Sequence, residues 1–319
     1  MVARLPNIAT CFTVGITNLD QGLAVDHLFL NVLNVVLPVL ICAGIGYSLA
    51  LFKAPFDNKV IGGIVSRVGY PTLIISHLST TKIAVATFLD VMAAAALAIA
   101  GFGALGFVAL RAMRLPVRAF LTPLMHGNVG NIGLPITLLA LGDAGMAYTM
   151  GFVVVVLISI FTVGMWIPAG EFSPKKLATS PIIYAVIVSL VLMATGYSLP
   201  QPVAKSFDIL GGLSIPLMLL TLGHTLASLQ VHRLGRAVIL TVLHLIMAIA
   251  IATALVWAFG FSGAERGAVI LCCLMPSSVA TYLFIDQHMP EYGPDVAGFI
   301  LVSTLATIVV LPMALSYWI

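Results

Sequence analysis

Charged residues are scarce in this sequence of 319 residues. Only 8% of the residues are Asp, Glu, Lys or Arg, whereas 61% are hydrophobic, and the mean hydropathy is +1.15. A soluble domain needs more charge on its surface, so a soluble protein is excluded. Runs of about 20 apolar residues, the length that crosses a ~30 Å hydrocarbon core as a helix, recur along the chain. We therefore predict an integral membrane protein with an all-α fold.

Several chemical signatures are absent as well. The cysteines have neither CxxC spacing nor a zinc-like spacing to histidine, so we expect no disulfide framework, metal site or cofactor; they are Cys11, Cys42, Cys272 and Cys273. The net charge of +3 is scattered without a basic stripe, which gives no support for nucleic-acid binding. The sequence contains no HExxH motif and no serine–histidine pair with the spacing of a catalytic site, so nothing in it indicates an enzyme. All eleven Asp and Glu fall in predicted loops or at span edges, which disfavours a sodium/proton antiporter with a midplane aspartate pair.

Ten transmembrane helices are predicted from the hydrophobic runs between charged or Pro/Gly-rich breaks. They cover Phe29–Phe52, Val60–Leu78, Phe88–Leu110, Ala119–Leu141, Ala144–Ile167, Pro181–Leu199, Ser206–Leu229, Ala237–Phe259, Gly267–Ile285 and Asp295–Trp318. Residues 1–28 contain only a weak apolar patch. We interpret them as a leader lying at the membrane interface, with a short extra helix as the alternative.

The positive charges predict the orientation, because Lys and Arg in short loops stay on the cytoplasmic side. With the N-terminus outside, nine lie in inside loops: Lys53, Lys59, Arg111, Arg114, Arg118, Lys175, Lys176, Arg233 and Arg236. Four lie in outside segments, namely Arg4, Lys82, Lys205 and Arg266. We therefore expect a multi-pass protein of the cell (inner) membrane with both termini outside.

The two halves of the chain repeat each other. Matching features follow in the same order: Gly46-Tyr-Ser-Leu49 with Gly196-Tyr-Ser-Leu199, Phe56-Asp57 with Phe207-Asp208, Pro71 with Pro216, and Pro135 with Pro276. The halves are residues 29–167 and 178–319, with five spans each. Because five is odd, the second half enters the membrane from the opposite side, which predicts two inverted five-helix repeats.

The fourth span contains a helix-breaking polar stretch, His126-Gly-Asn-Val-Gly-Asn-Ile-Gly-Leu-Pro135. Proline cannot donate a backbone N–H, and glycine lets the backbone leave helical geometry. We predict that this span is two half-helices, interrupted by the stretch that contains Gly127, Gly130, Gly133 and Pro135. Unwound backbone at membrane depth is tolerated only where protein or a water-filled cavity satisfies it.

The ninth span repeats this plan with Met275-Pro-Ser-Ser-Val-Ala-Thr281, and its second half-helix is predicted to start near Pro276. Two crossing breaks would bring together two helix N-termini, each carrying about +0.5 charge, which favours an anion. The predicted substrate-binding residues are Asn128, Gly130, Asn131, Gly133, Pro135, Pro276, Ser277, Ser278 and Thr281.

Plainer interpretations exist for these features. A single Gly/Pro break in a membrane helix is often only a packing kink. His126 and His224 lie within predicted spans and are candidates for proton coupling, because an intramembrane ionisable group is a functional candidate; a neutral histidine bonded to a neighbouring helix is the alternative. His77 and His244 are placed nearer span ends.

From about Val35 to Ile319 the chain resembles the auxin efflux carrier family, which includes plant PIN exporters and bacterial carriers assigned to malate or malonate. The resemblance rests on Leu37-Pro38 with Gly46-Tyr47, Gly127-Asn128 with Gly133-Leu134-Pro135, Gly223, Met275-Pro276, Ser303-Thr304 and Leu311-Pro312. It implies a scaffold of helices 1, 2, 6 and 7, a moving domain of helices 3–5 and 8–10, and Asn128 as a carboxylate ligand. Asn131, Ser277, Ser278 and Thr281 depart from the family pattern, which leaves the substrate open.

The sequence thus predicts a secondary transporter of a small organic anion, working by an elevator-like alternating access in the lipid bilayer. The alternative is a sodium-coupled organic anion symporter of the bile-acid type, because amide and carbonyl oxygens also suit sodium. Proton coupling, sodium coupling, uniport and a homodimer are left open.

Overall fold

The computed structural model describes residues 37–80, 83–170, 179–229 and 233–317. These residues are almost entirely helical, and an isolated bridge between Gly127 and Ser277 is the one β-type pairing among them. The prediction of an all-α fold is confirmed. The predicted leader, residues 1–28, lies outside the described residues, as do the start of the first predicted span and the end of the tenth.

The first half of the chain begins with a helix over Leu37–Leu51. There follow α2 (Asn58–Ile64), the π-helical segment η1 (Val65–Gly69), α3 (Tyr70–Thr80) and α4 (Val85–Ala112). The half ends with α5 (Val117–Met125), η2 (Val129–Gly133), α6 (Leu134–Ser159), η3 (Ile160–Gly164) and α7 (Met165–Ala169). Gly142 interrupts α6 with a φ of 68°, a conformation that favours glycine. It marks the turn between the fourth and fifth predicted spans.

The second half contains α9 (Pro181–Thr195), α10 (Gln201–Gly212), α11 (Ser214–Ser228) and α12 (Leu234–Phe259). It continues with α13 (Gly263–Leu274), α14 (Val279–His288), the short η4 (Pro290–Tyr292) and α15 (Gly293–Tyr317). In the described part of the chain, five helical stretches are long and apolar enough to cross a membrane, and two shorter helices are also apolar. The protein is therefore a multi-pass membrane protein, while the count of ten crossings and the inverted repeat stay predictions.

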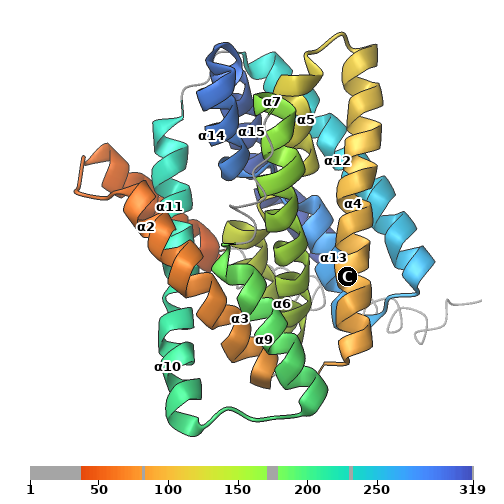
Figure 1. The fold of residues 1–319 in the computed structure, drawn as a ribbon. Coiled ribbons are helices and arrows are strands. Elements are labelled where there is room, and N and C mark those ends of the chain that lie inside the picture. Colours follow the sequence, from red (N-terminus) through yellow and green to blue (C-terminus); the bar gives the residue numbers. More distant parts are fainter. Residues whose placement is uncertain (1–36, 81–82, 171–178, 230–232, 318–319) are drawn as a thin grey trace, which may run out of the picture.

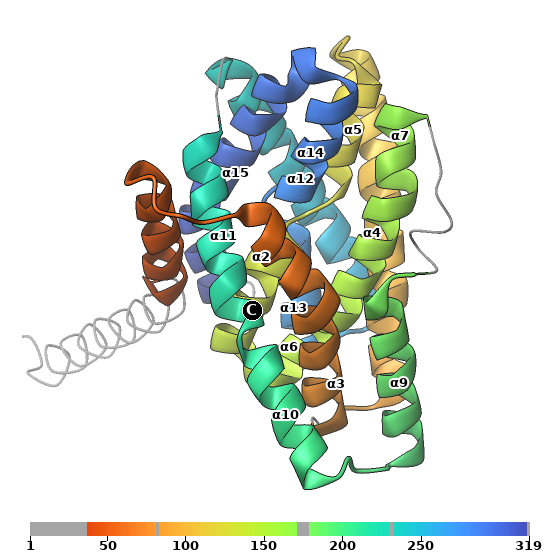
Figure 2. The same ribbon diagram turned by 60° about the vertical axis from the view of Figure 1, so that its left-hand side comes forward.

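The described helices form two packing groups. In the first group, α3 packs along α9 and α10, and the helix Leu37–Leu51 crosses α11. In the second group, α6 packs along α13 and α4, and α12 packs along α15. Figures 1 and 2 show α3 between α10 and α9 in both views. The contacts between the groups are fewer, and they join α11 to η2, α3 to α6, and α9 to α4 and α6.

Glycine permits a close helix crossing in the first group. A Cβ atom added at Gly46 would overlap the Leu220 carbonyl of α11, and one added at Gly223 would overlap the Ala43 carbonyl. Small residues let two membrane helices approach at backbone distance, where van der Waals contact replaces the hydrophobic effect. This crossing fixes the helix Leu37–Leu51 against α11.

Each of the three π-helical segments of the described chain contains the residue that lies four positions before a proline: Pro71, Pro135 and Pro168. Proline has no N–H to offer the carbonyl four residues earlier, and its ring clashes with that carbonyl in an α-helix. The wider π turn relieves this clash without ending the helix. The proline positions therefore explain where the helices deviate from regular α geometry.

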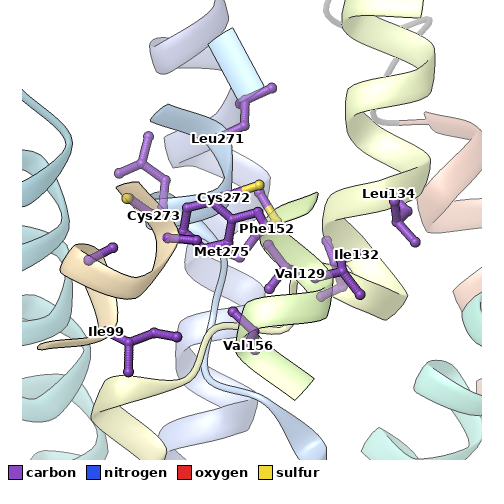
Figure 3. Packing of buried hydrophobic residues seen from close by; sticks show 14 of the residues in the cluster. Ile99, Val129, Ile132, Leu134, Phe152, Val156, Leu271, Cys272, Cys273 and Met275 are labelled. Atoms are coloured by element: carbon purple, nitrogen blue, oxygen red, sulfur yellow. The ribbon is translucent and has the colours of Figure 1, made fainter. Parts of the chain in front are cut away.

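The second group contains a densely packed apolar core. Phe88, Phe120, Met146 and Phe299 are completely buried in it. Figure 3 shows Cys272 and Met275 beside the neighbouring Val129 and Phe152. Other apolar side chains, such as Leu97, Val108, Trp257 and Val309, are exposed, as expected for a surface that faces lipid.

Candidate functional site

The fourth predicted span is interrupted, but not at the proline. Helix α5 ends at Met125, η2 begins at Val129, and His126 between them is extended, with φ of −119° and ψ of 106°. The interruption lies at the start of the predicted stretch, and Pro135 itself does not end the helix, which runs on from η2 into α6. The π turn of η2 accommodates its ring, and the chain unwinds around Gly127 instead.

The ninth predicted span is interrupted between Leu274 and Val279. The predicted start of its second half-helix near Pro276 was wrong by three residues. Pro276 lies within the unwound stretch, and Ser278 is the N-cap of α14, where its Oγ accepts a hydrogen bond from Ala280 N at 3.3 Å. A serine at this position satisfies one of the free N–H groups of the first turn.

The two breaks are paired through their backbones. Asn128 N donates to Pro276 O at 2.7 Å, and Ser278 N donates to His126 O at 2.9 Å. The Gly127–Ser277 bridge between them is antiparallel. These bonds satisfy polar backbone groups that would otherwise be costly to bury.

The antiparallel pairing also sets the electrostatics of the crossing. It places the N-terminus of α14 beside the C-terminal end of α5, and the N-terminus of η2 beside the C-terminal end of α13. A helix carries about half a positive charge at its N-terminus and half a negative charge at its C-terminus. Each positive end therefore lies beside a negative end, which weakens the combined positive field that the sequence predicts.

The predicted hydroxyl residues of the ninth span hold the breaks in place. Ser277 Oγ donates to Pro123 O at 2.8 Å, and Thr281 Oγ1 donates to Ser278 O at 2.6 Å. Ser277 and Thr281 are fully buried, and Ser278 is 6% exposed. Because the hydroxyl protons of Ser277 and Thr281 are already used inside the protein, these two residues fix the geometry of the crossing rather than present donors to a ligand. Ser278 acts as an acceptor at the N-cap of α14.

The amide of Asn128 is different. Its side chain is only 4% exposed, and its Nδ2 makes no hydrogen bond with any described residue. An unsatisfied buried donor costs about 1–3 kcal/mol, so native proteins rarely retain one without a purpose. Asn128 lies immediately before the first turn of η2, where the backbone N–H groups also lack intrahelical partners.

Asn131 contributes to the same place from within η2. Its Oδ1 lies 3.5 Å from the hydroxyl of Tyr70 in α3, and its backbone carbonyl lacks the usual partner because Pro135 has no N–H. A Cβ atom at Gly130 would overlap that hydroxyl, so the small residue lets Tyr70 approach. Gly133 is buried beside Met275.

Sequence reasoning missed Tyr70, which brings a hydroxyl from the first packing group to the second. The available signal was the Gly69-Tyr70-Pro71 stretch in a span that contains one of the repeated prolines. It also missed His244, which was placed near a span end. His244 lies within α12, 2% exposed, and its Nε2 is 3.0 Å from Met275 O in the second break.

His126 lies in the first break and is completely buried. Its Nδ1 donates to Thr122 O at 2.9 Å, since a carbonyl can only accept, and its Nε2 lies 2.9 Å from Ser159 Oγ, whose proton it can accept. A neutral ring thus satisfies both nitrogens.

The other predicted proton-coupling candidate, His224, belongs to the first packing group. Its Nδ1 lies 3.0 Å from Asn58 Nδ2, and its ring stacks on Phe56. These contacts tie α11 to α2 and the segment before it.

The described residues contain no group of three or more His, Cys, Asp or Glu that could hold a metal ion.

Comparison with known proteins supports a role in transport. A family model described as "Membrane transport protein" matches residues 165–315, which include the second break. The chain is also 24% identical over 310 residues to an uncharacterized transporter of Methanocaldococcus jannaschii, covering 90% of this chain and 98% of that protein. Both similarities are to membrane transport proteins. The protein is therefore a membrane transporter, which is consistent with the expectation that it is not an enzyme.

Proposed function

We propose that this transporter carries a small organic anion, a monocarboxylate or dicarboxylate, by alternating access. The observation that supports this most is the unbonded, buried amide of Asn128 at the N-terminus of η2. The free backbone N–H groups of the first turn favour a carboxylate there. Asn128 Nδ2 and Tyr70 OH add neutral donors, so the site binds an anion without a buried basic side chain.

Movement of one packing group against the other provides the access. Asn128 is nearly sealed from water, so an anion reaches it only when the groups separate or slide. An apolar cavity of about 100 Å³ lies between the groups, lined by side chains of the helix Leu37–Leu51, η2, α6, α11 and α15. Such unfilled space makes sliding less costly than in a fully packed interface. We therefore assign the first group as the scaffold and the second as the moving domain of an elevator.

A screen for ligands tests the substrate class. Purified protein is heated with acetate, benzoate, malonate or succinate as choline salts, with choline chloride and glycerol as controls. An anion at 100 times its Kd stabilises the folded state by about 2.7 kcal/mol, which raises the melting temperature. Stabilisation by glycerol or choline but by none of the anions would contradict the proposal.

The variant Asn128→Leu tests the site because two opposite effects are expected: higher stability without the anion, and no further stabilisation when the anion is added. Leucine has a similar volume and no donor to leave unbonded, so the ligand-free variant should be about 1–3 kcal/mol more stable. The stabilisation by the active anion should disappear at the same time. Thr137→Ala is the matched control, because Thr137 is buried in the helical stretch that follows Asn128 and bonds only to Gly133 O and Leu134 O. If Asn128→Leu still responds to the anion, the site is elsewhere.

The sodium-coupled alternative is separated by uptake into proteoliposomes. The active anion from the screen is offered with and without an inward sodium gradient at constant pH and membrane potential. Uptake that requires sodium would identify a symporter of the bile-acid type in place of the sodium-independent carrier.

A further inference from the structure

Three arginines surround one cavity at an end of the second packing group. Arg111 lies in the last turn of α4, Arg114 in the turn that follows, and Arg118 in the first turn of α5. All three are exposed, and no Asp or Glu occurs from residue 91 to residue 142. The cavity is open and has a volume of about 700 Å³; its other lining residues are Leu115, Pro116, Val117, Met289 and Tyr292. The cavity therefore combines guanidinium groups with apolar side chains.

Arg114 occupies a backbone position that glycine normally takes. Its φ is 56°, and the turn is closed by bonds from Arg114 N to Arg111 O at 3.1 Å and from Leu115 N to Leu110 O at 2.9 Å. This pattern ends many helices, with the residue at the left-handed position usually a glycine because a side chain is disfavoured there. Backbone outliers of this kind cluster at functional sites. The side chain of Arg114 is therefore a candidate for binding a ligand.

The other two arginines are held in place by their neighbours. Arg118 Nε donates to Ile167 O at 3.3 Å and its Nη2 donates to Pro168 O at 2.9 Å, which leaves further N–H groups on the same guanidinium. The guanidinium of Arg111 lies 5.2 Å from the centroid of the Phe107 ring. No ion pair among the described residues involves any of the three arginines. Their positive charges are therefore available to an anionic ligand.

The cavity lies at the depth of lipid headgroups. Helix α4 has 28 residues, and at about 1.5 Å per residue it is roughly 42 Å long, which exceeds the ~30 Å hydrocarbon core. Its last turn, with Arg111, therefore reaches the headgroup layer. Tyr292 packs edge-on against Phe120 with ring centroids 5.9 Å apart, and tyrosine is enriched at this depth. Glu291, beside Tyr292, is exposed and does not line the cavity.

We propose that this cavity binds the headgroup of an anionic phospholipid. Guanidinium groups bind phosphate oxygens through paired N–H donors, and basic pockets at the cytoplasmic ends of membrane helices bind acidic headgroups. The glycerol and the first acyl carbons of the lipid lie against the apolar lining, which a free phosphate ion cannot fill. The site is separate from the one at Asn128, and every residue that lines it belongs to the second packing group. The lipid is therefore bound to the group that we assign as the moving domain.

The first experiment compares lipids on the wild-type protein. Delipidated protein in a non-ionic detergent is heated with increasing amounts of phosphatidylglycerol, of phosphatidylcholine with the same acyl chains, or of inorganic phosphate. We expect phosphatidylglycerol to raise the melting temperature with saturation, at roughly tenfold lower amounts than phosphatidylcholine, and phosphate to have little effect. An equal effect of the two lipids would overturn the proposal. An equal effect of phosphate and phosphatidylglycerol would identify a site for a soluble anion instead.

The second experiment removes two of the arginines. Arg111→Gln combined with Arg114→Gly takes away two positive charges and keeps Arg118, which ties α5 to α7. This variant should need roughly 10- to 30-fold more phosphatidylglycerol for the same rise in melting temperature. Lys53→Gly combined with Lys59→Gln is the matched control, because it removes the same charge from a predicted inner loop of the scaffold, and Lys53 is also left-handed, with a φ of 52°. An equal loss in the control would reveal unspecific attraction to basic loops and overturn the site.

A single substitution decides the question even if the double variant does not fold. Glycine suits the left-handed backbone at position 114, so Arg114→Gly without lipid should melt at the wild-type temperature or above it. Its response to phosphatidylglycerol should still be weaker than that of the wild type. An equal response of the two proteins would show that Arg114 does not bind the headgroup, and the proposal would fall. None of these measurements uses an organic anion, so the proposed carrier function stands or falls on its own tests.

Discussion

At the scale of single residues, two kinds of polar side chain lie at the crossing: some are hydrogen-bonded within the protein, and others have a buried polar atom without a hydrogen bond. Ser277, Thr281 and His126 have their protons engaged in hydrogen bonds inside the protein. Asn128 Nδ2 and His244 Nδ1 are buried without a bond. A transporter has to leave some groups unsatisfied, because its cargo completes them for only part of the cycle.

Tyr70→Phe tests whether the hydroxyl from the scaffold contributes to binding. A single hydrogen bond is worth about 0.5–1.5 kcal/mol, so the variant should bind the active anion roughly two- to tenfold more weakly. The melting temperature without anion should change little, since the 3.5 Å contact with Asn131 is a weak one. Titration of the anion by thermal shift measures both quantities. Unchanged affinity would remove Tyr70 from the site.

The sequence predicted Asn128 and Asn131 because a polar residue in an apolar, glycine-rich span stands out locally. It could not predict Tyr70 or the contact of His244 with the second break. Their importance depends on which helices lie together, and nothing within several residues of either position signals that contact. It also could not assign Ser277 and Thr281 to structural bonds, because a free hydroxyl and a bonded one look the same in a sequence.

At the scale of helices, the sequence indicates that prolines interrupt the fourth and ninth spans, but in the fourth span the interruption lies at a glycine. Pro135 sits in a continuous helix because η2 widens to accept it, whereas the true break lies at Gly127. The existence of both interruptions followed from the sequence. Their positions did not, because a π turn can accommodate a proline inside a helix, so the proline alone does not mark the break.

The glycine crossing of the scaffold gives a prediction at this scale. Gly223→Ala adds one methyl group that would overlap the Ala43 carbonyl, so α11 and the helix Leu37–Leu51 must move apart. We expect a fall of several degrees in the melting temperature and lower yield of folded protein. Gly212→Ala in α10 is the matched control, since a Cβ there meets nothing within 4 Å. Equal stability of the two variants would show that the crossing is not needed.

At the scale of the whole molecule, the two packing groups meet through few contacts. His77 of α3 and Asp143, at the turn after Gly142, approach within 3.8 Å across this boundary. Ser76 of α3 and Asp208 of α10 lie 3.4 Å apart within the scaffold. These pairs mark one contact that the proposed movement must break and one that it preserves.

Cross-linking tests the movement. In a protein whose four native cysteines are replaced, His77→Cys with Asp143→Cys is joined by a short bifunctional methanethiosulfonate. Uptake of the active anion into proteoliposomes should fall to background and recover on reduction. Ser76→Cys with Asp208→Cys, joined in the same way, should leave most of the uptake. Full transport by the cross-linked first pair would rule out relative motion of the two groups at this boundary.

The bridge between Gly127 and Ser277 has a consequence for how such carriers diversify. Its bonds join main-chain atoms, so side chains that do not themselves bond to the two breaks can be exchanged without removing the bridge. Neighbouring positions such as 128, 131 and 70 are then free to change one at a time. Related carriers can therefore change their substrate while the backbone bridge between the two breaks stays the same.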